Sequence, residues 1–266
     1  MSLIRALVCL ALLLASPAVA QDTMRMAVTT SFHNSGLSEV LLPLAEEQID
    51  LRVDLIVVGT GQALRLGRAG DVDAILVHSR AAEEAFVADG FGTHRREIMY
   101  NDFVVIGPAD DPAGVRDAET ATDALSRILQ SEAPFASRGD ESGTHLREKS
   151  LWEAAGLQPD GAWYRALGSG MGATLNTAVG MQAYVLSDRA SWLNFGNKSG
   201  LEILFEGDPA LFNQYAYLPV DPDRHPHVRA DLAARFEEWL TSPEIQETIG
   251  GYQLNGEVLF VPNAEG

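Results

Sequence analysis

The sequence predicts an α/β protein, and three observations support this class. From residue 23 onward, short apolar runs of strand length alternate with stretches that have the apolar spacing of helices. The chain has 266 residues, which suits one large or two small domains. Hydroxyl and glycine residues recur where a strand is expected to pass into a helix, and ligands of open α/β sheets bind at that edge.

The first half of the chain predicts four strands and four helices. The helix at 35–48 is indicated by Leu37, Val40, Leu41 and Leu44, which recur at intervals of about three to four residues. A strong β run at 100–106 ends at Gly107 and Pro108, which interrupt a strand. The expected strands are 24–29, 51–58, 73–77 and 100–106, and the expected helices are 35–48, 61–68, 81–88 and 120–130.

The second half continues the alternation and ends in two helices. The helix at 142–155 begins at Ser142, a favourable N-cap, and is closed by Gly156. The expected strands are 134–137, 183–186, 201–205 and 215–220, and the expected helices are 142–155, 174–181, 189–193, 228–240 and 243–249.

The first twenty residues predict a secretory signal peptide. One positive charge in residues 1–5 precedes the apolar run 6–15, and Ala18-Val19-Ala20 fits an A-x-A cleavage site. Pro17 interrupts the run before it reaches the roughly 20 residues that a membrane-spanning helix needs. The only cysteine, Cys9, lies in this segment and follows Val8, where a lipid-attachment signal requires a small residue. We therefore expect cleavage after Ala20, no membrane anchor, no disulfide and a periplasmic location.

Composition and charge exclude several classes of protein. Hydrophobic residues make up 46% of the chain and charged residues 21%, as in ordinary globular proteins. There are 37 acidic and 19 basic residues, a net charge of −18. A large surface for nucleic acid or for an anionic membrane is therefore not expected.

Three strand-to-helix transitions share a composition that suits an anion. A helix N-terminus carries unpaired N–H donors and a partial positive charge, and small hydroxyl or glycine residues let an anion approach it. Ser, Thr and Gly are also the commonest residues of caps and turns, so one such loop alone is more often structural. The three loops are 29–36 (TTSFHNSG), 58–62 (VGTGQ) and 137–145 (SRGDESGTH), and 168–172 (GSGMG) and 187–189 (SDR) have a similar composition.

Arg138 adds a charged donor to the third loop. Its planar guanidinium can pair with an oxyanion through two parallel hydrogen bonds. The alternative is a surface ion pair with Asp140 or Glu141, and the residue alone favours neither interpretation. We interpret Asp140 as a group that orients Arg138 or caps the helix at Ser142. The role of His145 is left open by the sequence.

Six blocks of the chain together resemble a known family. They are TTS at 29–31 followed by SGL at 35–37, VGTGQAL at 58–64, GDVD at 70–73, MYNDFVVIGP at 99–108, SRGDESGTH at 137–145 and YVLSDR at 184–189. In this order they resemble the tungstate-binding periplasmic proteins of ABC transporters, the TupA family, from about Met24 to Tyr252. The segment 138–144 also resembles the anion loop of phosphate-binding periplasmic proteins, which keeps phosphate, and with it sulfate, as an alternative ligand.

The resemblance implies a type II periplasmic-binding fold, with two α/β lobes, a two-strand hinge and tungstate in the cleft between the lobes. The aromatic-flanked strands 100–108 and 215–219 are the best candidates for the hinge. On this basis residues 22–103 and 217–266 form lobe one, and residues 104–216 form lobe two.

The expected function is capture of tungstate, or of nearly isosteric molybdate, for delivery to the membrane permease of an ABC transporter. We expect a monomer without a cofactor and without a protein-chelated metal ion. The main expected ligand-binding residues are Thr30, Ser31, Thr60, Gly61, Arg138, Ser142, Gly143 and Thr144. A second group of candidates consists of Thr29, Ser137, Gly170, Met171 and Gly172.

Other functions fit the sequence less well. Ser142 and His145 lie three residues apart, but the chain has no G-x-S-x-G motif, so a secreted hydrolase is disfavoured. A phosphate-binding P-loop is absent from the sequence. His225 and His227 suggest a metal site only weakly, because no third ligand lies at a suitable spacing. Asp71 and Asp73 are interpreted as turn and strand-start residues.

Overall fold

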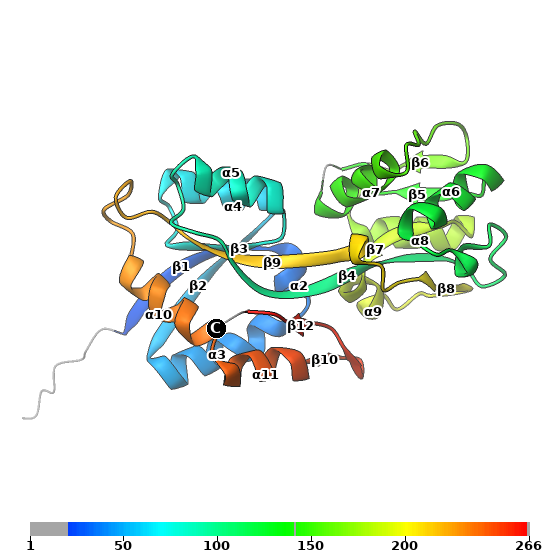
Figure 1. The fold of residues 1–266 in the computed structure, drawn as a ribbon. Coiled ribbons are helices and arrows are strands. Elements are labelled where there is room, and N and C mark those ends of the chain that lie inside the picture. Colours follow the sequence, from blue (N-terminus) through cyan, green and yellow to red (C-terminus); the bar gives the residue numbers. More distant parts are fainter. Residues whose placement is uncertain (1–20, 141, 265–266) are drawn as a thin grey trace, which may run out of the picture.

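A computed structural model describes residues 21–140 and 142–264 of the chain (Figure 1). The predicted signal peptide lies outside these residues. The strands are β1 (Asp22–Thr29), β2 (Leu51–Val58), β3 (Ala74–Val77), β4 (Arg96–Pro108), β5 (Phe135–Ser137), β6 (Tyr164–Ala166), β7 (Val185–Asp188), β8 (Leu201–Phe205), β9 (Phe212–Pro219), β10 (Gln253–Leu254), β11 (Glu257–Val258) and β12 (Val261–Pro262).

The helices alternate with these strands along most of the chain. They are α2 (Thr30–Asn34), α3 (Leu37–Ile49), α4 (Thr60–Ala69), α5 (Arg80–Ala88), α6 (Ala121–Ser131), α7 (Gly143–Ala154), α8 (Met171–Met181), α9 (Arg189–Asn194), α10 (Ala230–Leu240) and α11 (Pro243–Gly251). Short 3-10 turns occupy Val115–Asp117 and Pro209–Leu211. No helix among the described residues combines the length and the apolar character needed to cross a membrane.

The main sheet is mixed. Its strands follow the order β12-β4-β9-β3-β1-β2, and β7 and β8 also pair with β4. β1 is parallel to both β2 and β3, whereas β9 is antiparallel to both β3 and β4. β5 and β6 form a separate parallel pair. The alternation of strands and helices thus produces the predicted α/β class.

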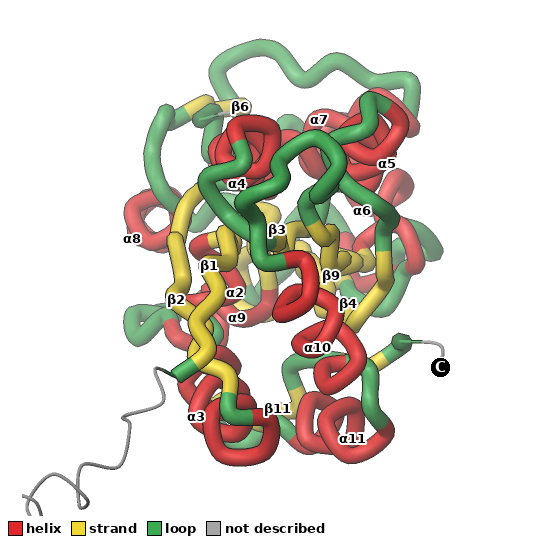
Figure 2. Tube along the Cα trace, turned by 90° about the vertical axis from the view of Figure 1, so that its left-hand side faces the viewer, coloured by secondary structure: helices red, strands yellow, loops and turns green. Residues whose placement is uncertain are grey.

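Two lobes are joined by β4 and β9, which run side by side from one lobe into the other (Figure 1). In lobe one the helices cover both faces of the sheet: α4 and α5 lie on one face, and α3 and α11 lie on the other (Figures 1 and 2). Successive residues of β1 alternate between these layers, because Met26 and Val28 pack with α3, α10 and α11, while Ala27 packs with α4 and α5. Val105 and the helices α6 and α7 contribute to a separate core in lobe two.

The predicted elements are present with shifted ends. The helix α2 and the short strands β6, β10, β11 and β12 were not predicted. The sequence suggested a loop at 30–34, since serine, threonine, asparagine and histidine are weak helix formers. The Thr29 side chain accepts a hydrogen bond from the Phe32 backbone N–H and so begins this short helix. The next helix begins at Leu37 and not at Ser35, because Gly36 adopts a left-handed conformation with φ of 82°.

Candidate anion-binding cleft

The carboxyl ends of β1, β2 and β3 meet at one edge of the lobe-one sheet. Thr29, the last residue of β1, pairs with Val58, the last residue of β2. β3 lies on the other side of β1. The helices α2, α4 and α5 therefore begin close together at this edge, which is where open α/β sheets bind ligands.

The first loop presents hydroxyl groups at this edge. Thr30 is exposed, Ser31 is partly buried and Thr29 is buried. The Ser31 Oγ lies 3.1 Å from the Thr29 Oγ1 and 3.0 Å from the Tyr215 hydroxyl. Thr29 is already engaged as the cap of α2, so Thr30 and Ser31 are better placed for a ligand than Thr29 is.

The second loop leaves backbone donors available at the start of α4. Gly59 is the N-cap and supplies no side chain to the first turn. A methyl group added to Gly59 would meet no other atom within 4 Å, so the loop borders open space. Thr60 and Gly61 thus present N–H groups and one hydroxyl group at a helix N-terminus.

The third loop holds Arg138 and Asp140 together. Arg138 Nη2 donates to Asp140 Oδ2 at 2.5 Å, and the Ser142 backbone N–H donates to Asp140 Oδ1 at 3.2 Å. The Ser142 hydroxyl in turn accepts from the His145 N–H at 3.3 Å and caps α7. Asp140 therefore performs both predicted roles, since it orients Arg138 and supports the start of the helix.

The electrostatics of this loop favour a second acceptor for Arg138. Burial raises the pKa of Asp140, but the hydrogen bonds from Ser142 and Arg138 outweigh it and lower the pKa overall. The carboxylate is therefore ionised at neutral pH. The Nε of Arg138 is buried and has no hydrogen-bond partner among the described residues. A buried N–H without a partner is costly, so an anion at this point would satisfy it.

Ser137, from the second group of candidates, and Thr144, from the main group, are both buried. Ser137 is fully buried, and its hydroxyl lies beside the Glu148 carboxylate inside lobe two. Burial raises the pKa of Glu148, against hydrogen bonds from Tyr164 and Trp152. The Ser137 Oγ has no hydrogen-bond partner among the described residues. Ser137 therefore contacts the lobe core more than open space. Thr144 is also buried, on the first turn of α7, whereas Gly143 beside it is exposed.

A cavity of about 380 Å³ joins the first loop to the start of α8. Ser31 and Asn34 line it from lobe one, and Gly172 lines it from lobe two. The N-cap of α8 is Gly170, which again supplies no side-chain cap, so the N–H groups of Met171 and Gly172 are unpaired helix donors. The buried carboxylate of Asp188 also lines the cavity, and it accepts from the Ser191 N–H at 2.9 Å.

The structure brings Ser31 and Gly172 to one cavity, but it does not join every predicted residue. Thr60 and Gly61 belong to lobe one and Arg138 to lobe two, and among the described side chains Thr60 and Arg138 share no hydrogen bond. Whether these groups converge on one anion stays a prediction.

His78 is a residue of this region that sequence reasoning missed. It follows β3, and its Nε2 lies 3.1 Å from the Ser31 Oγ. Its ring lies 4.8 Å, centre to centre, from that of Tyr215. The available signal was its position between Val77 and Ser79, which is one more strand-to-helix transition with a hydroxyl group.

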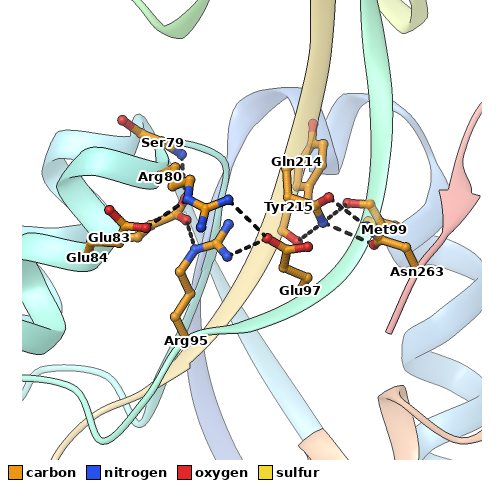
Figure 3. A network of polar contacts seen from close by, with 10 residues as sticks. All are labelled: Ser79, Arg80, Glu83, Glu84, Arg95, Glu97, Met99, Gln214, Tyr215 and Asn263. Atoms are coloured by element: carbon orange, nitrogen blue, oxygen red, sulfur yellow. Dashed lines mark hydrogen bonds and ion pairs between the residues drawn. The ribbon is translucent and has the colours of Figure 1, made fainter. Parts of the chain in front are cut away.

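A polar network behind the cleft supports the neighbours of His78 and Tyr215 (Figure 3). Glu83 accepts from the Ser79 N–H and from Arg95, which also donates to Glu97. Gln214 donates to the backbone carbonyls of Met99 and Tyr215 and exchanges hydrogen bonds with Asn263. The ends of β3 and β9 are thereby tied to α5 and to the C-terminal segment.

The remaining polar candidates make structural contacts. His225 and His227 hydrogen-bond through Nε2 to the backbone carbonyls of Arg68 and Gly70. The Asp73 carboxylate accepts from the backbone N–H groups of Arg25 and Arg229, in agreement with its interpretation as a strand-start residue. Among the described residues there is no group of three or more potential metal ligands.

Comparisons with known proteins agree with this architecture. The profile of the PBP superfamily domain matches residues 15–244. A curated relative, the tungstate-binding protein TupA of Peptoclostridium acidaminophilum, is 44% identical over 250 residues, which cover 92% of this chain and 87% of the relative.

Solved structures give the same result. The tungstate-binding protein TupA from Desulfovibrio alaskensis G20 is 46% identical, with a TM-score of 0.87, and the match covers 92% of this chain and all of that one. The tungstate ABC transporter structure from Geobacter sulfurreducens is 47% identical, with a TM-score of 0.78 over 88% of this chain and all of that one. The chain therefore belongs to the PBP superfamily and, within it, to the family of the TupA proteins.

Proposed function

We propose that this chain is an extracytoplasmic solute-binding protein that captures a tetrahedral oxyanion, with tungstate as the preferred ligand and molybdate close behind it. The observation that carries the proposal is the set of unsatisfied donors at the lobe boundary. The starts of α4 and α8 lack side-chain caps, and the Nε of Arg138 is buried without a partner. The TupA relatives, named for tungstate, support the identity of the anion.

The proposed ligand shell takes donors from both lobes. Thr30, Ser31, Thr60 and Gly61 contribute from lobe one, and Arg138, Ser142, Gly143 and Thr144 contribute from lobe two. An anion that contacts both sets stabilises the closed arrangement of the lobes through its higher affinity for it. We place the boundaries of the lobes at 103/104 and 216/217, within the connecting strands β4 and β9.

Protonation separates tungstate from phosphate. Tungstate, molybdate and sulfate carry only acceptors near neutral pH, whereas phosphate usually brings a proton that needs an acceptor. Both oxygens of Asp140 already accept hydrogen bonds, from Arg138 and from Ser142. An unpaired buried group costs about 1–3 kcal/mol, so phosphate binding should be weaker by roughly one to two orders of magnitude.

Delivery to the membrane permease of an ABC importer completes the proposed role. In this role the exported chain, cleaved after Ala20, works as a monomer in the periplasm and turns over no substrate. The absence of a G-x-S-x-G motif and of a P-loop from the sequence supports binding over catalysis.

Titration calorimetry of the mature chain with tungstate, molybdate, sulfate and phosphate tests the proposal. We expect one anion per chain, with tungstate and molybdate ahead of sulfate and phosphate, because their longer metal–oxygen bonds suit donors spaced across a cleft. Absence of binding heat with all four anions would overturn the proposed function. Phosphate that displaces tungstate at comparable concentration in equilibrium dialysis would reassign the chain to phosphate transport.

A further inference from the structure

His78 lies where three parts of the site meet. Because β3 runs between β1 and β9 in the sheet, the residue that follows β3 is flanked by Ser31 on one side and Tyr215 on the other. The opposite lobe reaches the same ring, because a Cβ added to Gly143 would lie only 3.0 Å from the Cε1 of His78. The ring therefore lies beside a predicted ligand-binding residue of each lobe, Ser31 and Gly143.

The His78 ring is neutral at neutral pH. Burial is the main cause that lowers its pKa to about 4, and the positive charge of Arg147 lowers it further, while its own backbone and the Asn213 side chain act in the opposite direction. The hydrogen bond of the ring to a described side chain is the one between Nε2 and the Ser31 Oγ. A neutral imidazole has one N–H donor and one acceptor nitrogen. Its Nε2 can therefore either donate a proton to Ser31 or accept one from it, and the two cases differ in what Ser31 can offer a ligand.

The hydroxyl of Ser31 has a single proton and three neighbours. The Tyr215 phenol is fully buried and its pKa is raised by burial, so it remains a donor. If Nε2 carries the proton, the Ser31 oxygen can accept from both His78 and Tyr215, and its own proton is then left for Thr29 or for an anion. If Nε2 accepts instead, the Ser31 proton is taken up by the ring, and the anion loses a donor.

We propose that His78 is a positioning residue for the anion site: its Nε2–H donates to the Ser31 oxygen and thereby turns the Ser31 hydroxyl proton toward the bound oxyanion. This inference rests on the proposed function. It goes beyond that function by assigning a role to a residue that carries no charge and that does not itself need to contact the ligand.

Three substitutions of His78 distinguish a hydrogen bond to Ser31 from simple packing, because they differ in where they place a donor. In His78→Gln the side-chain amide can place a donor near the position of Nε2, whereas the shorter His78→Asn places it near Nδ1, out of reach of Ser31. His78→Phe keeps a ring without a donor. Calorimetry with tungstate should give near-parent affinity for His78→Gln and about tenfold weaker binding for His78→Asn and His78→Phe, as expected for the loss of one oriented hydrogen bond.

A double-mutant cycle tests whether His78 acts through Ser31. Since the hydroxyl is the group being oriented, Ser31→Ala combined with His78→Phe should bind tungstate no more weakly than Ser31→Ala alone. Additive losses would overturn the proposal. Equal losses in the Gln, Asn and Phe variants would also overturn it, because that pattern indicates a packing role.

Nitrogen-15 NMR of the unaltered protein provides a readout that does not depend on a variant folding. The tungstate-bound chain should show the ring proton of His78 on Nε2, and a proton on Nδ1 would contradict the assignment. If the parent binds none of the four anions, the proposed function fails as well. If the parent binds tungstate but the NMR tautomer of His78 or the double-mutant cycle contradicts the proposal, only the role assigned to His78 is wrong.

Discussion

At the scale of single residues, Arg138 is the strongest candidate for recognition of the anion charge. Its side chain is 18% exposed and is held by Asp140, so it is oriented before a ligand arrives. Replacement by alanine would leave the anion with neutral donors only. We expect a loss of binding free energy on the order of 2–4 kcal/mol, from loss of a charge-assisted, bidentate pair.

The Arg138→Lys variant serves as the control for this prediction. A lysine ammonium keeps the charge but lacks the planar fork, so it should recover only part of the lost affinity. Calorimetry of both folded variants with tungstate provides the comparison, and parent-like binding by Arg138→Ala would show that this residue is not a ligand.

The lowered pKa of His78 predicts that the stability of the folded chain depends on pH. Its pKa is about 4 in the folded chain, against 6.5 for an ordinary histidine. The unfolded chain therefore binds a proton more readily, and stability that is present above pH 6.5 is lost as the pH falls toward 4. The loss should be at most about 3 kcal/mol. Urea unfolding at pH 7 and pH 4.5 should show that the free energy of unfolding falls less in His78→Gln than in the parent. Equal decreases in the two proteins would show that protonation of His78 does not destabilise the fold.

At the scale of secondary-structure elements, the start of α4 allows a test of backbone donors. Gly59 has φ of −75° and ψ of 157°, a conformation that is compatible with a following proline. Proline is tolerated at the first helical position, so Thr60→Pro removes the hydroxyl and the N–H without breaking α4.

Comparison with Thr60→Ala isolates the contribution of the N–H group. Loss of the hydroxyl alone should cost about 1 kcal/mol, and loss of the N–H to a charged ligand should add about 1.5–3 kcal/mol. Tungstate calorimetry should therefore rank the parent above Thr60→Ala and Thr60→Ala above Thr60→Pro. Equal affinities of the two variants would show that the helix N-terminus does not bind the anion.

The sequence predicted the elements well where local signals determine them. Leu37, Leu41 and the other apolar residues of α3 have helical spacing, and Ser142 is a cap in the structure as expected. Arg138 and Asp140 are two residues apart, so their pairing could also be foreseen. The helix α2 could not be predicted from the sequence, because its five residues have low helix propensity and the helix depends on the Thr29 cap.

The role of His78 could not be predicted for a different reason. Ser31, His78 and Tyr215 are far apart in the sequence and meet only because β3 lies between β1 and β9. No local pattern encodes that strand order. The proximity of His78 to Gly143 depends further on how the two lobes face each other.

At the scale of the whole molecule, β4 and β9 are the only strands described that run between the lobes, and side-chain contacts brace them. Arg189 on α9 donates to both oxygens of Asp102 on β4, at 2.7 and 2.6 Å. Arg147 on α7 donates to the backbone carbonyls of Ala210 and Phe212, where β9 begins. These contacts attach α9 to β4 and α7 to the start of β9, so helices next to the connecting strands hold both of them.

Binding of an anion between the lobes should stabilise the whole chain against heat. A ligand that binds only the folded state at about 100 times its Kd adds about 2.7 kcal/mol of stability. For a protein of 150–250 residues, each kcal/mol raises Tm by about 2–4 °C, so tungstate should raise Tm by about 5–11 °C. At the same concentration phosphate should give a clearly smaller shift, because both oxygens of Asp140 are already engaged and a phosphate proton beside Arg138 is left without an acceptor there. Differential scanning calorimetry at pH 7 measures both shifts, with Arg138→Ala as the control that should respond weakly to either anion. Equal shifts from tungstate and phosphate would show that protonation of the ligand does not govern selection at this site.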